Sequence, residues 1–92
     1  MIIWKYTLKV TDTQSFRIPK GSKILTVQTQ NDIPCIWVLV DQKEELTEVR
    51  TIGIHGTGNP IPDNPGIYIG TFQIRYGQLV FHVFDETNTL FQ

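Results

Sequence analysis

The residues best suited to chemistry gather in and before a short glycine-rich segment, Gly56-Thr57-Gly58. Consecutive backbone N–H groups in such a turn can form a concave anion-binding site, and the threonine adds a hydroxyl. Arg50 and His55 precede the segment on one predicted strand, and Asn59 follows it. No helix is predicted after the segment and no Gly-Lys-Ser/Thr ends it, so it lacks the strong signatures of a phosphate-binding loop. The segment is a candidate site for a small anionic ligand, and the competing interpretation is a turn that needs two glycines to bend sharply.

Three residues outside this segment extend the candidate site. Trp37 and Tyr68 offer aromatic faces on which a flat ring can stack. Lys20, followed by Gly21-Ser22, combines a cation with backbone donors, although its cluster of basic neighbours is also typical of a solvated face. The candidate ligand-binding residues are Lys20, Trp37, Arg50, His55, Gly56, Thr57, Gly58, Asn59 and Tyr68.

Catalytic and metal-binding motifs are missing from the sequence. There is no G-x-S-x-G, no H-E-x-x-H and no pair of cysteines at zinc spacing. His55 and His82 lie on different predicted strands, with no Asp or Glu at a diagnostic offset. Cys35 opens the most apolar stretch of the chain, which favours a buried, unreactive thiol. We therefore expect no enzyme, no catalytic residue, no metal site and no cofactor.

The elements that must position these residues are predicted to be strands. Isoleucine, valine and threonine number 30 of the 92 residues and alanine is absent, a composition that favours strands over helices. Apolar and polar residues alternate with a period of two, and no stretch shows the helical period. The predicted strands are Ile2–Val10, a short one around Phe16 and Ile18, Lys23–Gln30, Ile33–Val40, Val49–His55, Ile67–Ile74 and Leu79–Phe84. Together they predict an all-β fold, a small antiparallel β-sandwich or open barrel of about seven strands.

Local signals refine this prediction. Leu25 and Val27 are expected on the core side of their strand. Asn31-Asp32 is a candidate two-residue hairpin turn, weaker than Asn-Gly because no glycine follows. Gly70 inside a strand suggests a bulge or a close approach of another backbone. Residues 56–66 form the longest irregular segment, stiffened by three prolines.

Size and charge limit the function classes. A chain of 92 residues makes a single domain, 1–92, whose residues 85–92 read as a polar C-terminal tail containing Leu90-Phe91. Eight basic and nine acidic residues exclude binding of bulk nucleic acid through positive charge. The longest apolar run, six residues, is too short for a membrane helix. Several strands are apolar on both faces, which predicts a binding groove or a homo-oligomer interface, unless the N-terminal strand or the tail covers these faces.

A series of short sequences runs through almost the whole chain. They are Ile3-Trp4-Lys5-Tyr6, Thr11-Asp12, Ile18-Pro19-Lys20-Gly21-Ser22-Lys23-Ile24-Leu25, Val27-Gln28-Thr29-Gln30-Asn31, Pro34-Cys35-Ile36-Trp37, Gly56-Thr57-Gly58-Asn59-Pro60-Ile61-Pro62, Tyr68-Ile69-Gly70-Thr71-Phe72-Gln73 and Leu79-Val80-Phe81-His82-Val83-Phe84. In these segments the chain resembles a family of short uncharacterised proteins encoded largely by bacteriophages. The resemblance implies a phage accessory protein acting in the cytoplasm of a bacterial host. It carries no activity and no binding residues.

Small phage proteins without catalytic machinery often act on host immunity. This expectation determines which hypothesis of function is placed first. The first is a non-enzymatic protein that sequesters a small anionic nucleotide signal, since a rigid pocket with aromatic faces binds a nucleotide without bulk positive charge. The alternatives are an inhibitor that binds a host protein, such as a nuclease or CRISPR complex, and a small structural protein of the virion or its assembly.

Overall fold

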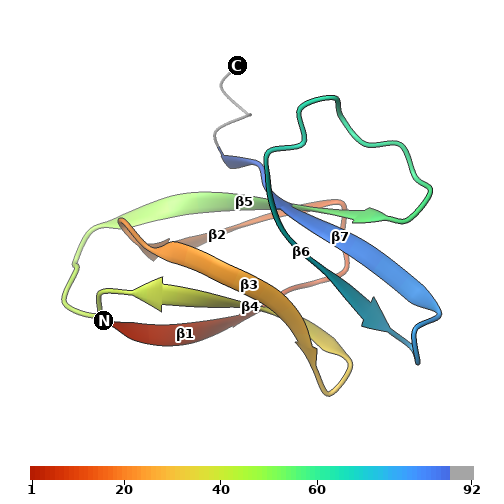
Figure 1. Ribbon diagram of the computed structural model, residues 1–92. Coiled ribbons are helices and arrows are strands. Elements are labelled where there is room, and N and C mark those ends of the chain that lie inside the picture. Colours follow the sequence, from red (N-terminus) through yellow and green to blue (C-terminus); the bar gives the residue numbers. More distant parts are fainter. Residues whose placement is uncertain (88–92) are drawn as a thin grey trace.

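Alternating β-branched and polar residues form seven strands in the computed structural model, which describes residues 1–87 (Figure 1). The strands are β1 (Ile2–Thr7), β2 (Thr13–Pro19), β3 (Lys23–Gln30), β4 (Ile33–Val40), β5 (Thr47–Gly56), β6 (Ile67–Ile74) and β7 (Leu79–Asp85). The predicted all-β sandwich is confirmed, and the two sheets do not close into a barrel. The predicted bounds of β3, β4 and β6 agree with those observed.

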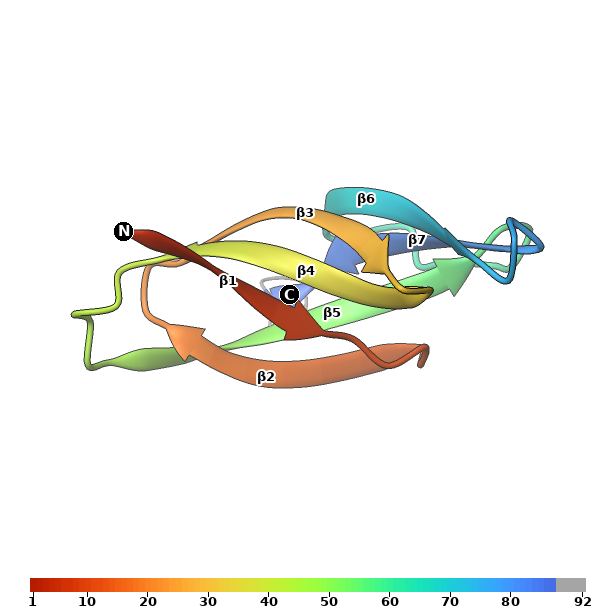
Figure 2. The same cartoon turned by 90° about the horizontal axis from the view of Figure 1, so that it is seen from below.

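The strands form two antiparallel sheets. The first sheet has the order β1-β4-β3 and the second has the order β2-β5-β7-β6. Figure 2 shows the first sheet lying over β2 and β5, with β6 beside β3 at one edge. Because β5, β7 and β6 are neighbours, residues far apart in the sequence come together on one surface of the second sheet.

The hydrophobic core lies between the sheets. Its fully buried side chains come from both sheets and include Ile18, Ile36, Val38, Val40, Ile52 and Val83. Burial of each such side chain contributes about 1.5–3 kcal/mol, and the β-branched shapes suit a pleated surface. On β5 the core residues Ile52 and Ile54 alternate with outward-facing Gly53 and His55, so one strand serves both the core and the opposite surface.

The expected core position of Leu25 is wrong. The pairing of β3 with β4 shifts register between Ile24 and Thr26, so Leu25 is the extra residue of a β-bulge. Its side chain is 40% exposed, while Ile24 packs against the core and Val27 is buried. The bulge interrupts the period of two, so that residues 24 and 27, rather than 25 and 27, face the same side.

The expected hairpin at Asn31-Asp32 is confirmed. Both residues have positive φ, 53° and 64°, as the two central residues of a type I′ turn require. The carboxylate of Asp32 accepts hydrogen bonds from the N–H of Arg75, at 3.0 and 3.2 Å. These bonds tie the β3–β4 hairpin of the first sheet to the β6–β7 hairpin of the second, a role that glycine could not fill.

Both expectations for Gly70 are confirmed. The pairing of β6 with β7 shifts register between Tyr68 and Gly70, which marks a bulge. A Cβ added to Gly70 would lie 2.8 Å from Cγ1 of Val27 in β3. Gly70 therefore permits the edges of the two sheets to approach without a side chain between them.

The buried thiol predicted for Cys35 is confirmed, although this residue lies on the outer face of the first sheet. Cys35 pairs in register with Thr7 on one side and Gln28 on the other. Nζ of Lys5 in β1 donates to Oε1 of Gln30 in β3 at 2.6 Å, so this bond crosses β4 diagonally over Cys35.

The ends of three strands differ from the prediction. Strand β1 ends at Thr7 rather than Val10, and Leu8 turns into the core with its N–H bonded to the carbonyl of Pro34. Strand β5 begins two residues earlier than predicted, and β7 continues to Asp85. Residues 88–92 of the expected tail, with Leu90 and Phe91, lie outside the described residues. Residues 1–87 contain no helix of the length and apolarity that crossing a membrane requires.

Candidate functional site

The two histidines meet on the outer face of the second sheet. His55 of β5 and His82 of β7 are direct cross-strand partners, and Thr71 of β6 lies opposite His82 on the other side. Side chains that oppose each other in an antiparallel pair project from the same face. This row of three residues forms the floor of the candidate site.

A cavity of about 220 Å³ opens beside this row, under the long loop that joins β5 to β6 (Figure 1). It is lined by His55, Gly56, Thr57, Gly58, Asn59, Ile61, Tyr68, His82 and Phe84. Six of the nine residues predicted to bind a ligand therefore line one cavity. We call it the turn cavity.

The glycine-threonine segment makes a tight turn at the rim of the turn cavity. The N–H of Thr57 bonds to the carbonyl of Val80 at 3.1 Å, and the N–H of Asn59 bonds to the carbonyl of Gly56 at 3.1 Å. Gly58 has a φ of 88°, which favours glycine. A side chain on Gly56 would meet the amide of Asn59, 2.9 Å from the Cβ position. The backbone of Gly58 thus favours glycine, while a side chain at Gly56 would require the amide of Asn59 to move.

His82 is held by hydroxyl groups on both ring nitrogens. Oγ1 of Thr57 lies 2.7 Å from Nε2, and Oγ1 of Thr71 lies 2.9 Å from Nδ1. The hydroxyl of Tyr68 bonds to that of Thr71 at 2.5 Å. A continuous chain of hydrogen bonds therefore runs from Tyr68 through Thr71 and His82 to Thr57. Sequence reasoning assigned no site role to His82 or Thr71, and the signal available was that His82 and Phe84 share a face of their strand.

His55 has a different environment. Its Nε2 is buried and has no hydrogen-bond partner within residues 1–87. A Cβ added at Gly53 would lie 3.2 Å from this nitrogen and 2.8 Å from Oε2 of Glu86. The ring packs edge-on against Phe84, with centroids 5.9 Å apart. The ring is therefore positioned by packing.

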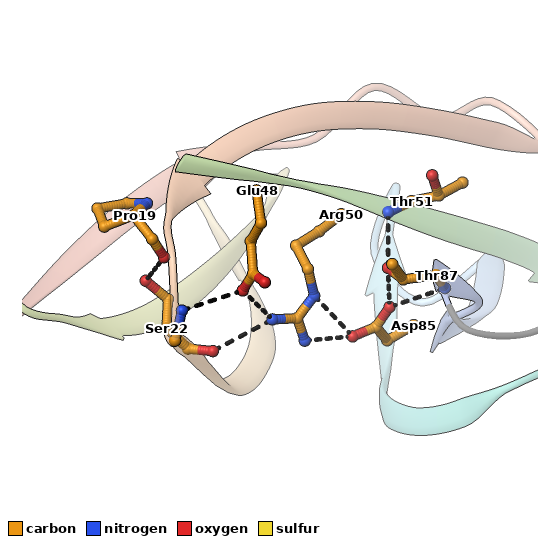
Figure 3. Close-up of polar contacts among 8 residues, drawn as sticks. Pro19, Ser22, Glu48, Arg50, Thr51, Asp85 and Thr87 are labelled. Atoms are coloured by element: carbon orange, nitrogen blue, oxygen red, sulfur yellow. Dashed lines mark hydrogen bonds and ion pairs between the residues drawn. The ribbon is translucent and has the colours of Figure 1, made fainter. Parts of the chain in front are cut away.

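Arg50 lies elsewhere, on the inner side of β5 (Figure 3). Its guanidinium forms an ion pair with Asp85 and also donates to Oε1 of Glu48 at 3.3 Å and to the carbonyl of Ser22 at 3.1 Å. Burial alone would raise the pKa of the Asp85 carboxyl, but hydrogen bonds from Thr87 and Arg50 outweigh it and hold that pKa below its ordinary value. Arg50 therefore joins the two sheets at this end of the sandwich.

Arg50 also lines a second cavity, of about 340 Å³, between the edges of β3 and β6. Its walls are Ser22, Lys23, Ile24, Leu25, Arg50, Ile67, Tyr68, Ile69 and Asp85. We call it the edge cavity. Tyr68 is a wall of both cavities, and the bulged residues Leu25 and Ile69 both line the edge cavity.

Trp37 and Lys20 are not brought to either cavity. Trp37 lies on β4, between Lys5 and Thr26 on the outer face of the first sheet. Lys20 is exposed in the turn between β2 and β3, where its N–H bonds to the carbonyl of Leu46. The aromatic wall predicted for the ligand is supplied by Tyr68 together with Phe84, whose rings are 5.4 Å apart.

A comparison with protein families matches residues 1–90 to a domain of unknown function, DUF7352. The chain belongs to the DUF7352 family. No curated protein and no solved structure matches it. Both cavities of this DUF7352 chain lie within the matched residues.

The charges of the two cavities differ. The turn cavity of the DUF7352 chain has no Lys or Arg in its lining, while the edge cavity has Lys23 together with the ion pair of Arg50 and Asp85. Across residues 1–87, no three His, Cys, Asp or Glu side chains are grouped so that they could hold a metal ion. The turn cavity thus suits an uncharged aromatic group, and the edge cavity suits an anionic one.

Proposed function

We propose that this DUF7352 protein is a non-enzymatic phage accessory protein that binds and sequesters a small nucleotide signal in the host cytoplasm. The observation that carries the proposal is that six predicted ligand residues line the turn cavity, which shares Tyr68 with the cationic edge cavity. The base occupies the turn cavity and the phosphate reaches the edge cavity across Tyr68.

The turn cavity suits one base. Its volume of about 220 Å³ is below the range of sites for drug-sized ligands, so it takes one ring system rather than a whole nucleotide. Tyr68 and Phe84 supply aromatic surface, and stacking of a base on such side chains contributes about 1–3 kcal/mol. The loop between β5 and β6 contains Pro60, Pro62 and Pro65, which limit the conformational entropy lost on binding.

Lys23 is the cation assigned to the phosphate. Within residues 1–87 its ammonium group makes no hydrogen bond or ion pair, so its three donors are available to a ligand. The guanidinium of Arg50 lines the same cavity, but it donates to Asp85, Glu48 and Ser22. The charge of Arg50 is balanced by Asp85 in the same cavity, so Lys23 is the cation that contacts the phosphate.

Thermal unfolding with a panel of nucleotides tests this proposal. The panel contains cyclic dinucleotides, cyclic oligonucleotides and cyclic ADP-ribose isomers. A ligand at a hundredfold excess over its Kd stabilises the folded protein by about 2.7 kcal/mol, which raises the Tm by several degrees. If no nucleotide raises the Tm, the proposal is wrong, and capture of partners from a host lysate is the next experiment.

Two tyrosines provide a matched pair of variants. Tyr68→Ala removes the wall shared by the two cavities and is expected to abolish the ligand-induced rise in Tm. Tyr76→Ala removes a tyrosine that is fully exposed in the β6–β7 turn and lines neither cavity, so the rise should persist. Equal losses in the two variants would place the ligand outside the cavities.

A second candidate function, inhibition of a host protein, is favoured by the free edge of β1. Ile2, Ile3 and Trp4 are 39%, 57% and 40% exposed on a strand that pairs on one side only. Exposed apolar strand edges pair with other chains. The same edge is the surface we assign to the proposed homo-oligomer, so measurement of the oligomeric state bears on both.

A further inference from the structure

The hydrogen-bond chain around His82 has a direction. The hydroxyl of Thr57 lies 3.4 Å from the carbonyl oxygen of Val80, which can only accept. If Thr57 donates to this carbonyl, its oxygen accepts from Nε2–H of His82. Nδ1 of the neutral ring then accepts from the hydroxyl of Thr71, and Thr71 in turn accepts from the hydroxyl of Tyr68. Every proton in this arrangement has an acceptor.

The opposite direction makes fewer bonds within the protein. With the proton of His82 on Nδ1, Thr57 donates to Nε2 and Thr71 donates to the oxygen of Tyr68. The carbonyl of Val80 then loses the bond from the hydroxyl of Thr57, and the proton of Tyr68 has no partner within residues 1–87. A phenol is also a stronger donor than an aliphatic hydroxyl, which favours Tyr68 as the donor to Thr71. The first direction therefore has the lower free energy.

This direction determines what Tyr68 offers to a ligand. The hydroxyl proton of Tyr68 is donated to Oγ1 of Thr71 in a hydrogen bond. The phenol oxygen can therefore only accept further hydrogen bonds. Tyr68 is 56% exposed and lines the turn cavity, so a ligand can reach it.

His55 also lines the turn cavity, but its Nε2 is buried and has no hydrogen-bond partner within residues 1–87. The phenol oxygen of Tyr68 is therefore the acceptor to which we assign the selection of a ligand.

We infer that the turn cavity selects a nucleobase that bears an exocyclic amine, because an N–H group of that amine meets the acceptor of Tyr68. This inference rests on the proposed function and names the class of base that the site takes. A base without the amine leaves this acceptor without that bond in a partly closed cavity, which costs binding free energy.

Isothermal titration with two matched pairs of nucleotides tests the inference. One pair is AMP and purine riboside 5′-monophosphate, and the other is GMP and IMP; within each pair only the exocyclic amine differs. We expect the amine-bearing nucleotide of at least one pair to bind about tenfold more tightly or better. Equal affinities within both pairs overturn the inference but leave the proposed function standing. Binding by none of the four overturns the inference, while the separate nucleotide panel still decides the proposed function.

Tyr68→Phe isolates the phenol oxygen, because it keeps the aromatic face and removes only the acceptor. It should reduce the preference within the pair to about twofold or less, with little change for the amine-free nucleotide. Tyr76→Phe should leave the preference intact. A preference that survives Tyr68→Phe unchanged overturns the assignment of this oxygen.

Nitrogen-15 NMR of the His82 ring tests the direction without any ligand. We expect the ring proton on Nε2 and a lone pair on Nδ1. A proton on Nδ1 reverses the chain, makes Tyr68 a donor and overturns the inference. This measurement does not depend on whether a nucleotide binds.

Discussion

The guanidinium of Arg50 on β5 and the carboxylate of Asp85 on β7 form an ion pair at one end of the sandwich (Figure 3). The same guanidinium donates to the carbonyl of Ser22, which immediately precedes β3 of the opposite sheet. One side chain therefore links both sheets, at a position where the core has given way to polar groups. The side chains of Arg50 and Asp85 are 19% and 9% exposed, so the pair is largely shielded from water.

Arg50→Ala is expected to lower the free energy of unfolding by about 2–4 kcal/mol, because it leaves the Asp85 carboxylate buried without its cation. Urea denaturation of the variant and the wild type measures this change. Arg17→Ala is the control, since Arg17 is an exposed residue whose bond to Thr47 is 3.3 Å long, and its effect should stay below about 1 kcal/mol. Equal effects of the two substitutions would contradict a structural role for Arg50.

The stability of the protein should fall in acid through Asp85. The folded-state pKa of this carboxyl is lowered, so its stabilising contribution is present above the ordinary carboxyl pKa of about 4 and is lost as the pH falls through the lower folded value. Urea denaturation across this range measures the loss. Asp85→Asn should be less stable at neutral pH and lose less stability in acid. The idea fails if wild type and variant lose stability in parallel.

Gly70→Ala is expected to destabilise the fold by about 1–3 kcal/mol, because the new Cβ overlaps the side chain of Val27. The Cβ position is 2.8 Å from Cγ1 of Val27, and the φ of Gly70 is not positive, so the effect comes from packing alone. Val27→Ala removes the overlapping methyl groups and creates a small cavity of its own. The double variant should therefore be more stable than the sum of the two single effects implies, by about 1 kcal/mol. Additive effects would mean that the two strands separate freely.

The repeating pattern of a strand was predictable from the sequence, and its interruptions were not. The bounds of β3, β4 and β6 follow from the alternation of apolar and polar residues, which depends only on neighbours in the chain. The bulge at Leu25 depends on how β3 pairs with β4, and no residue type marks it. A glycine does mark the second bulge, so the sequence revealed Gly70 and missed Leu25.

The residues of the candidate site also divide into those that the sequence could reveal and those that it could not. The glycine-threonine turn and His55 were found because they are contiguous in the sequence. His82 and Thr71 were not, because they join the site only through the register of β7 with β5 and β6. Trp37 was included for its chemistry alone, and nothing in a single sequence shows that its strand belongs to the other sheet.

The free edge of β1 should support self-association. A lysine on an edge strand normally deters pairing, but the amine of Lys5 is bonded to Gln30 across the face of the sheet. Light scattering is expected to give a mass above the 10.6 kDa of one chain. Ile3→Lys places a charge on this edge and should reduce the mass to that of one chain. A wild-type mass of 10.6 kDa would refute the proposed homo-oligomer.

Strand β7 carries the core and the candidate site on alternate residues. Val83 is fully buried between the sheets, while its neighbours His82 and Phe84 line the turn cavity. Substitutions at His82 or Phe84 therefore change the surface of the turn cavity without removing a side chain from the core. A shift of one residue in the pairing register of β7, in contrast, would expose Val83 and bury His82 and Phe84. Such a register error would therefore destabilise the fold and disrupt the turn cavity together.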